Sequence, residues 1–128
     1  MIIHHFSNIL VVDDSSVVRS VVRRLLTQLG YRNIDEVADG AAALAKISEN
    51  HFDLVISDWN MEPMGGDALL EQVRASEKYK NLPFIMMTAD STIDKIVQAR
   101  RAGVSCFINK PFGADALQAK ITEINKEF

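Results

Sequence analysis

Five polar residues of this sequence are spaced so that they could act together, because each follows a short apolar run. They are Asp13, Asp14, Asp58, Thr88 and Lys110. Three carboxylates gathered without a counter-charge repel one another, so a cation must lie among them. Lys110 supplies one positive charge, and a hard divalent ion with oxygen ligands supplies the rest. Mg²⁺ fits this role better than zinc, because it binds through one or two carboxylates and a phosphate oxygen, and the set offers no thiolate or imidazole.

A carboxylate beside a magnesium site can attack phosphorus and form an aspartyl phosphate. Asp58 is the candidate nucleophile, because it stands alone after the run 53–57, whereas the adjacent Asp13 and Asp14 are better placed to hold an ion. Thr88 and Lys110 would then bond the transferred oxygens and stabilise charge during phosphoryl transfer. The alternative is that each residue only caps its own turn. A single site explains five such residues at strand ends better than five separate caps do.

Apolar runs alternate with helical stripes along the whole chain. Short buried runs predict strands at 8–12, 34–38, 53–57, 82–88 and 104–108. Apolar residues at helical spacing predict helices at 17–29, 41–50, 68–75, 92–102 and 114–128. Because the connections are short and crossovers are right-handed, this alternation predicts an α/β fold with helices on both faces of a parallel sheet. The carboxyl ends of parallel strands share one edge, where the five polar residues would meet.

The composition is that of one soluble globular domain. At 128 residues the chain is long enough for a single core, and we expect one domain spanning residues 1–128. A hydrophobic content of 48% and a net charge of -3 argue against direct binding of nucleic acid. No apolar run reaches about 18 residues and no signal peptide is visible, so we expect a cytoplasmic protein without a membrane partner. The single cysteine, Cys106, excludes an internal disulfide and is expected to be an inert core thiol.

Three arginines lie between the apolar positions of the predicted helix 17–29. They are Arg19, Arg23 and Arg24. The simplest interpretation is a solvated helix surface, and the alternative is a basic patch that receives an acidic partner.

The spacing of the polar residues resembles that of the receiver domain of two-component response regulators. The resemblance rests on Asp13-Asp14, Asp58, Thr88-Ala89 and Lys110-Pro111, and it covers essentially the whole chain. Asp58-Trp59-Asn60-Met61 and Met64-x-Gly66 also resemble the family's loop after the phosphoacceptor. The resemblance implies a flavodoxin-like, doubly wound sheet of five parallel strands in the order 2-1-3-4-5 with five helices. It also implies a cis peptide between Lys110 and Pro111.

The same resemblance implies a function in two-component signal transduction. Asp58 would accept a phosphoryl group from a histidine kinase or phosphotransfer protein, and Asp13, Asp14, Asp58 and the backbone carbonyl of Asn60 would organise Mg²⁺. Such a protein is not an enzyme for a separate substrate, because it catalyses only its own phosphorylation and dephosphorylation. Because the sequence ends with the fifth predicted helix, the resemblance implies a stand-alone receiver, either a chemotaxis motor regulator or a phosphorelay intermediate.

The signal would be read on the surface formed by residues 92–102, 104–108 and 114–128. We expect Thr88 to move toward a phosphoryl oxygen and to leave room for Phe107 to turn inward, which biases two existing arrangements of that surface. The alternative is that Phe107 is an ordinary core residue of the fifth strand.

Two residues depart from the family's pattern. Glu62 stands where the family often has Pro, with Pro63 one residue later, which affects the geometry of the loop and not the nucleophile. Phe107 stands where the family often has Tyr, so it has no hydroxyl to bond a partner.

Three other classes of protein compete with this interpretation. A haloacid-dehalogenase-like phosphatase also uses an aspartate nucleophile and Mg²⁺, but it needs two aspartates separated by one residue, and Asp13 and Asp14 are adjacent. A flavodoxin-like FMN carrier needs a phosphate loop rich in Ser, Thr and Gly, where this pair of acids would repel the anion. A receiver that binds partners without being phosphorylated is the third class, and no residue missing from the site supports it.

Overall fold

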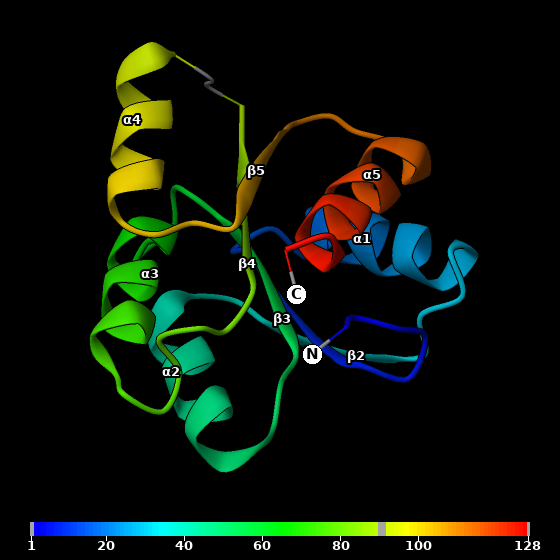
Figure 1. The fold of residues 1–128 in the computed structure, drawn as a ribbon, viewed down its shortest axis with the longest axis horizontal. Coiled ribbons are helices and arrows are strands. Elements are labelled where there is room, and N and C mark those ends of the chain that lie inside the picture. Colours follow the sequence, from blue (N-terminus) through cyan, green and yellow to red (C-terminus); the bar gives the residue numbers. More distant parts are fainter. Residues whose placement is uncertain (1, 90–91, 128) are drawn as a thin grey trace.

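The chain folds into a parallel sheet with helices on both faces (Figure 1). The structure is a computed structural model, and it describes residues 2–89 and 92–127. Its elements, in chain order, are β1 (Asn8–Val12), α1 (Ser16–Gln28), β2 (Asn33–Val37), α2 (Gly40–Glu49), β3 (Leu54–Asp58), α3 (Gly66–Ala75), β4 (Phe84–Thr88), α4 (Ile93–Arg101), β5 (Cys106–Asn109) and α5 (Ala114–Asn125). The strand order β2-β1-β3-β4-β5 confirms the predicted doubly wound, flavodoxin-like fold.

The sheet separates two apolar cores, one under each layer of helices. Figure 1 shows α1 and α5 on one side of the sheet and α2, α3 and α4 on the other. The first core contains Leu26 of α1 and Ile121 of α5, and the second contains Leu69 and Leu70 of α3. Because β1, β3 and β4 are buried on both faces, they are nearly continuous apolar runs, as their sequence indicates. β2 is an edge strand with exposed polar residues, as expected.

Two of the helices, α1 and α2, begin at side-chain caps near the residues where their apolar stripes start. The hydroxyl of Ser15 accepts from the Val18 N–H at 3.2 Å and caps α1. The carboxylate of Asp39 accepts from the Ala42 N–H at 2.9 Å and caps α2. Such caps satisfy backbone donors that have no partner within the helix.

Two strands, β4 and β5, begin two residues later than the sequence pattern predicts, because the backbone before them cannot join the ladder of the sheet. Pro83 accepts from the Val55 N–H at 3.0 Å but has no N–H to return, so β4 begins at Phe84 and not at residue 82. The Val104 N–H bonds the Ala99 carbonyl at 3.0 Å and closes the end of α4, so β5 begins at Cys106. α5 ends at Asn125, and the predicted helical position Phe128 lies outside the described residues.

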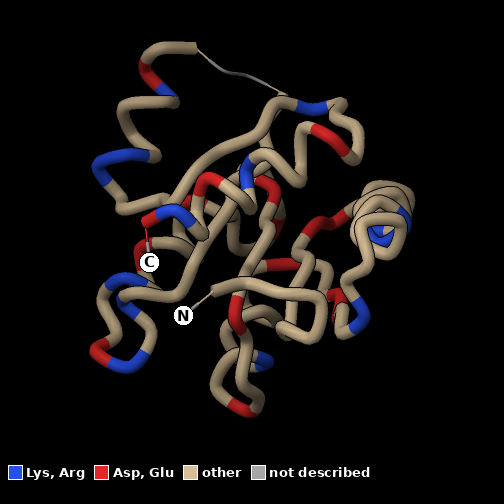
Figure 2. Tube along the Cα trace, turned by 45° about the vertical axis from the view of Figure 1, so that its right-hand side comes forward, with Lys and Arg blue, Asp and Glu red and all other residues tan. Residues whose placement is uncertain are grey.

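Charges of both signs are spread over the molecule. Figure 2 shows Lys and Arg at separate places along the chain trace, interspersed with Asp and Glu. Within residues 2–89 and 92–127, no helix combines the length and the apolar character needed to cross a bilayer.

Cys106 is a buried thiol whose reactivity can be predicted. Burial, with a smaller contribution from the charge of Glu123, raises its pKa to about 12. Because the thiolate is the nucleophile, we expect the native protein to react with iodoacetamide near pH 8 at least ~100-fold more slowly than the protein unfolded in guanidinium chloride. Mass spectrometry of the alkylated fraction over time measures both rates, with glutathione as the control for the denaturant. Equal rates would show that Cys106 is open to solvent in the native fold.

Candidate functional site

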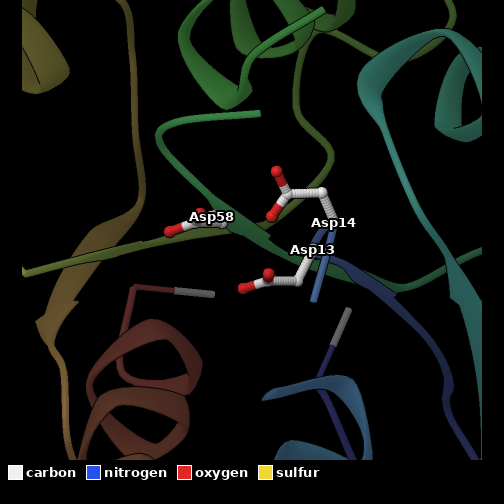
Figure 3. Close-up of side chains that lie close together, drawn as sticks. All are labelled: Asp13, Asp14 and Asp58. Carbon is white, nitrogen blue, oxygen red and sulfur yellow. The ribbon is translucent and has the colours of Figure 1, made fainter. Parts of the chain in front are cut away.

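The strand order brings the three predicted acids to one edge of the sheet. β1 and β3 are neighbours, with Val12 opposite Ser57, so the residues that follow β1 lie beside Asp58 at the end of β3. Figure 3 shows the carboxylates of Asp13, Asp14 and Asp58 directed into the same region. One candidate ligand oxygen from each lies within 4.8 Å of those of the other two. Asp58 therefore forms one pocket with the adjacent pair Asp13 and Asp14, although it is distant from them in the sequence.

Lys110 lies in this pocket and bridges two of the acids. It follows β5, whose pairing with β4 places Asn109 opposite Thr88. Its Nζ lies 2.8 Å from Asp58 Oδ1 and 3.1 Å from Asp13 Oδ2. The cation that the sequence requires among the carboxylates is thus partly supplied by the chain itself.

The pocket raises the pKa of both Asp58 and Lys110. Burial, opposed by the hydrogen bond from Lys110 and reinforced by the charge of Asp13, raises the pKa of Asp58 above its ordinary value. Burial by itself lowers the pKa of Lys110, but its hydrogen bonds and charge interactions with Asp58 and Asp13 raise it overall. Lys110 therefore stays protonated, while the Asp58 carboxylate is costly to ionise without further positive charge. The electrostatics of the pocket favour a second cation.

The pocket fits a small divalent ion. Mg²⁺ binds oxygen at about 2.1 Å, so two ligand atoms on opposite sides of one ion lie about 4.2 Å apart. The 4.8 Å limit among the three carboxylates is only slightly larger. Small side-chain rotations or a bridging water would let the acids share one ion, and an oxygen-only donor set is the kind that Mg²⁺ prefers.

The loop after β3 forms the open side of the pocket. Asn60 and Glu62 border a hollow of ≈ 330 Å³ together with Asp14 and Trp59. The exposed position of Asn60 beside Asp14 is compatible with the predicted use of its backbone carbonyl. Both Glu62-Pro63 and Lys110-Pro111 are cis, and the second is the peptide for which the resemblance implied this geometry.

Thr88 and Phe107 lie on neighbouring strands near the pocket. Thr88 is buried at the end of β4, and its carbonyl accepts from the Lys110 N–H at 2.8 Å. Phe107 stands opposite Met86 in the register of β5 and β4. Its ring is half-buried and packs against the second core, so it is less enclosed than the fully buried Phe84.

Two of the three arginines on α1 bind other parts of the chain, although the sequence analysis assigns them to a solvated surface. Arg19 Nη1 donates to the Asp13 carbonyl at 2.6 Å, and the Nε atoms of Arg19 and Arg23 lie 3.3 and 2.5 Å from oxygens of Glu36. The prediction of a solvated surface is therefore wrong for Arg19, whose side chain is 19% exposed, while Arg23 and Arg24 are exposed as expected. The spacing of Arg19 and Arg23, four residues apart, was the available signal, but their partner on β2 is visible only in the folded chain.

A parallel doubly wound α/β domain with three acids and a lysine at the carboxyl edge of its sheet has the architecture of a receiver. The sequence model of the response regulator receiver domain matches residues 9–122, and the chain belongs to this family. It is 44% identical over 116 residues to the chemotaxis protein CheY of Pseudomonas aeruginosa, covering 91% of this chain and 94% of that protein. The class is thus that of two-component signalling proteins.

Solved structures agree with this assignment. The chemotaxis response regulator CheY4 of Vibrio cholerae superimposes with a TM-score of 0.86 at 33% identity, covering 93% of this chain and 98% of that one. The receiver domain of the sensor histidine kinase PA1611 of Pseudomonas aeruginosa, solved with a magnesium ion coordinated in its active site cleft, has a TM-score of 0.85 at 27% identity. The superposition covers 94% of this chain and 98% of that one.

Proposed function

We propose that Asp58 accepts a phosphoryl group from the phosphohistidine of a histidine kinase or phosphotransfer protein, and that protein partners bind the resulting state. The observation that carries this proposal is the position of Lys110 Nζ, 2.8 Å from Asp58 Oδ1, in a pocket with two further carboxylates. An oxygen of Asp58 forms the new bond to phosphorus as the bond between phosphorus and the donor imidazole breaks. The leaving imidazole nitrogen keeps the bonding electron pair and takes a proton from solvent water.

Asp13, Asp14, Asp58 and the backbone carbonyl of Asn60 would hold Mg²⁺ in this pocket. When bound, the ion supplies positive charge that neutralises the phosphoryl oxygens. The acidic donor set of this chain supports the assignment, and a related receiver was solved with magnesium in the equivalent cleft. Lys110 can exchange its contacts with Asp13 and Asp58 for a phosphoryl oxygen, because its side chain already lies between them.

The signal is proposed to leave through α4, β5 and α5. Ile93 and Val97, which are 79% and 39% exposed on α4, offer apolar side chains for a partner. Thr88 would be drawn toward a phosphoryl oxygen, and Phe107 on the neighbouring strand would turn into the space it leaves.

The chemotaxis names of the relatives support a flagellar-motor partner over a phosphorelay partner. We further propose that residues 1–128 act as one receiver domain.

Intact-mass spectrometry tests the phosphoacceptor proposal. The protein is incubated with a small phosphodonor and Mg²⁺, and a parallel sample contains EDTA in place of the ion. One phosphoryl adduct per chain that depends on Mg²⁺ is expected, because the pocket lacks enough positive charge without the ion. A bound flavin in the purified protein, or repeated turnover of a phosphoester, would instead support one of the rival classes.

Thr88→Ala is expected to uncouple phosphorylation from the signal. The adduct should still form, since Asp58 and Lys110 remain, but amide hydrogen exchange in α4 and β5 should no longer respond to it, because no hydroxyl moves toward the phosphoryl group. Thr88→Ser keeps the hydroxyl and should preserve the response, which controls for the lost side-chain volume. A response in Thr88→Ala equal to that of the wild type would rule out this switch.

A further inference from the structure

The two adjacent acids of the pocket are joined by a peptide that an arginine holds from outside. Arg19 Nη1 donates to the carbonyl of Asp13 at 2.6 Å. That carbonyl belongs to the peptide bond between Asp13 and Asp14, so its orientation determines the direction in which both side chains leave the backbone. The Arg19 side chain is only 19% exposed, and the contact is therefore partly shielded from water.

Arg19 is itself held by an ion pair with Glu36, which also pairs with Arg23. Its Nε lies 3.3 Å from Glu36 Oε1, and Arg23 Nε lies 2.5 Å from Glu36 Oε2. Arg23 also donates from Nη2 to the Ile34 carbonyl at 2.8 Å. Both oxygens of Glu36 are thus engaged, and the guanidinium of Arg19 is held between β2 and the segment after β1.

The two acids differ in how much other support they have. Asp13 is buried, its Oδ1 accepts from the Ser15 N–H at 2.9 Å, and its Oδ2 lies 3.1 Å from Lys110. Asp14 is exposed, so its direction depends mainly on the backbone that carries it. A clamp on the peptide between them would matter most for Asp14.

We propose that Arg19 is a positioning residue of the magnesium site, holding the Asp13-Asp14 peptide so that both carboxylates face the pocket before the ion binds. Glu36 and Arg23 hold Arg19 in place. This inference rests on the proposed magnesium site and adds to it a residue that contacts neither the ion nor the phosphoryl group. Residues that orient metal ligands in this way typically contribute 10- to 100-fold to metal affinity.

Whether Mg²⁺ binding becomes weaker or stronger when Arg19 is replaced distinguishes a positioning role from a purely electrostatic one. Arg19 is a cation near a site for a cation, so its removal should strengthen Mg²⁺ binding if only long-range electrostatics matter. If Arg19 orients the ligands, its removal should weaken binding despite the lost repulsion. A substitution that removes the charge therefore gives opposite results under the two explanations.

Calorimetric titration of the full chain with MgCl₂ is the test. Arg19→Gln is expected to raise the Mg²⁺ dissociation constant about tenfold. Arg24→Gln removes the same charge from an exposed position on the same helix and should leave the constant unchanged or slightly lower. In the phosphodonor assay, Arg19→Gln should raise the half-saturating Mg²⁺ concentration and keep the plateau rate, a split that a general loss of fold would not produce.

Glu36→Gln provides a second variant if Arg19→Gln is poorly folded. It keeps the side-chain shape and weakens the ion pair with Arg19, and its control is Asp35→Asn, which removes an exposed charge from the same strand. We expect Glu36→Gln to raise the dissociation constant about threefold more than Asp35→Asn does. Circular dichroism and urea unfolding establish that each variant is folded under the titration conditions.

The outcomes distinguish this inference from the function on which it rests. If the wild type does not bind Mg²⁺, the proposed magnesium site fails. If the wild type binds and Arg19→Gln binds equally or more tightly, the positioning role of Arg19 is overturned while the site stands. Weaker binding in both Arg19→Gln and Arg24→Gln would also overturn the role, because it would indicate an effect of the helix surface in general.

Discussion

Replacing Asp58 with Asn is expected to abolish the phosphoryl adduct, which is the largest effect on activity predicted for this chain. The carboxamide cannot supply the anionic oxygen that attacks phosphorus, and no other carboxylate of the pocket ends the central strand β3. The measurement is the intact mass after incubation with a small phosphodonor and Mg²⁺, at a time when the wild type is largely modified. We expect the adduct of Asp58→Asn to be undetectable.

Asp35→Asn is the matched control for this loss. It makes the same chemical change at an exposed position on the edge strand β2 and should leave the adduct intact. A persistent adduct in Asp58→Asn would mean that another group accepts the phosphoryl group, with Asp13 or Asp14 as the nearest carboxylates. Peptide mapping of the modified protein would then identify the acceptor.

Replacing Gly66 with Ala is expected to destabilise the fold by more than ~3 kcal/mol, the largest effect on stability predicted here. A Cβ at this position would lie 2.0 Å from the backbone carbonyl oxygen of Asp58 and 2.9 Å from Met86 Sδ. The nearest atom is backbone in a buried central strand, which cannot move aside as a flexible side chain could. The free energy of unfolding, measured by urea denaturation, checks this prediction.

Gly113→Ala is the control for the loss of a glycine as such. A Cβ at Gly113 would have no neighbour within 4 Å. This position is the N-cap of α5, where alanine is less favourable than glycine, so we expect a cost of at most ~1 kcal/mol. Equal costs for the two substitutions would show that the close approach of Gly66 to Asp58 does not limit stability.

The effect at Gly66 should extend to the pocket. The Gly66 N–H donates to the Trp59 carbonyl at 2.9 Å and closes the loop that carries Asn60. Close packing at Gly66 therefore links the stability of the fold to the shape of the open side of the site.

The pattern of apolar runs was sufficient to predict the ten elements and the residues that follow the strands. Continuous apolar segments such as Leu54–Asp58 and Phe84–Thr88 are fully buried, because a parallel sheet covered on both faces leaves no polar side. The start of β5 was predicted two residues early, since the use of the Val104 N–H by the end of α4 is not visible in a local pattern. Local periodicity indicates which residues are apolar together and does not indicate where a hydrogen-bond ladder begins.

By itself the sequence determined the fold class, the edge of the sheet where Asp13, Asp14, Asp58, Thr88 and Lys110 belong, and the need for positive charge among the acids. These depend on residue type and spacing along the chain. Only the tertiary structure decided that Lys110 lies between Asp58 and Asp13, and that Arg19 holds the Asp13 carbonyl while Glu36 holds Arg19. The direction of a long, flexible side chain depends on which partners the folded chain brings within hydrogen-bond reach, and those partners lie on other segments of the chain.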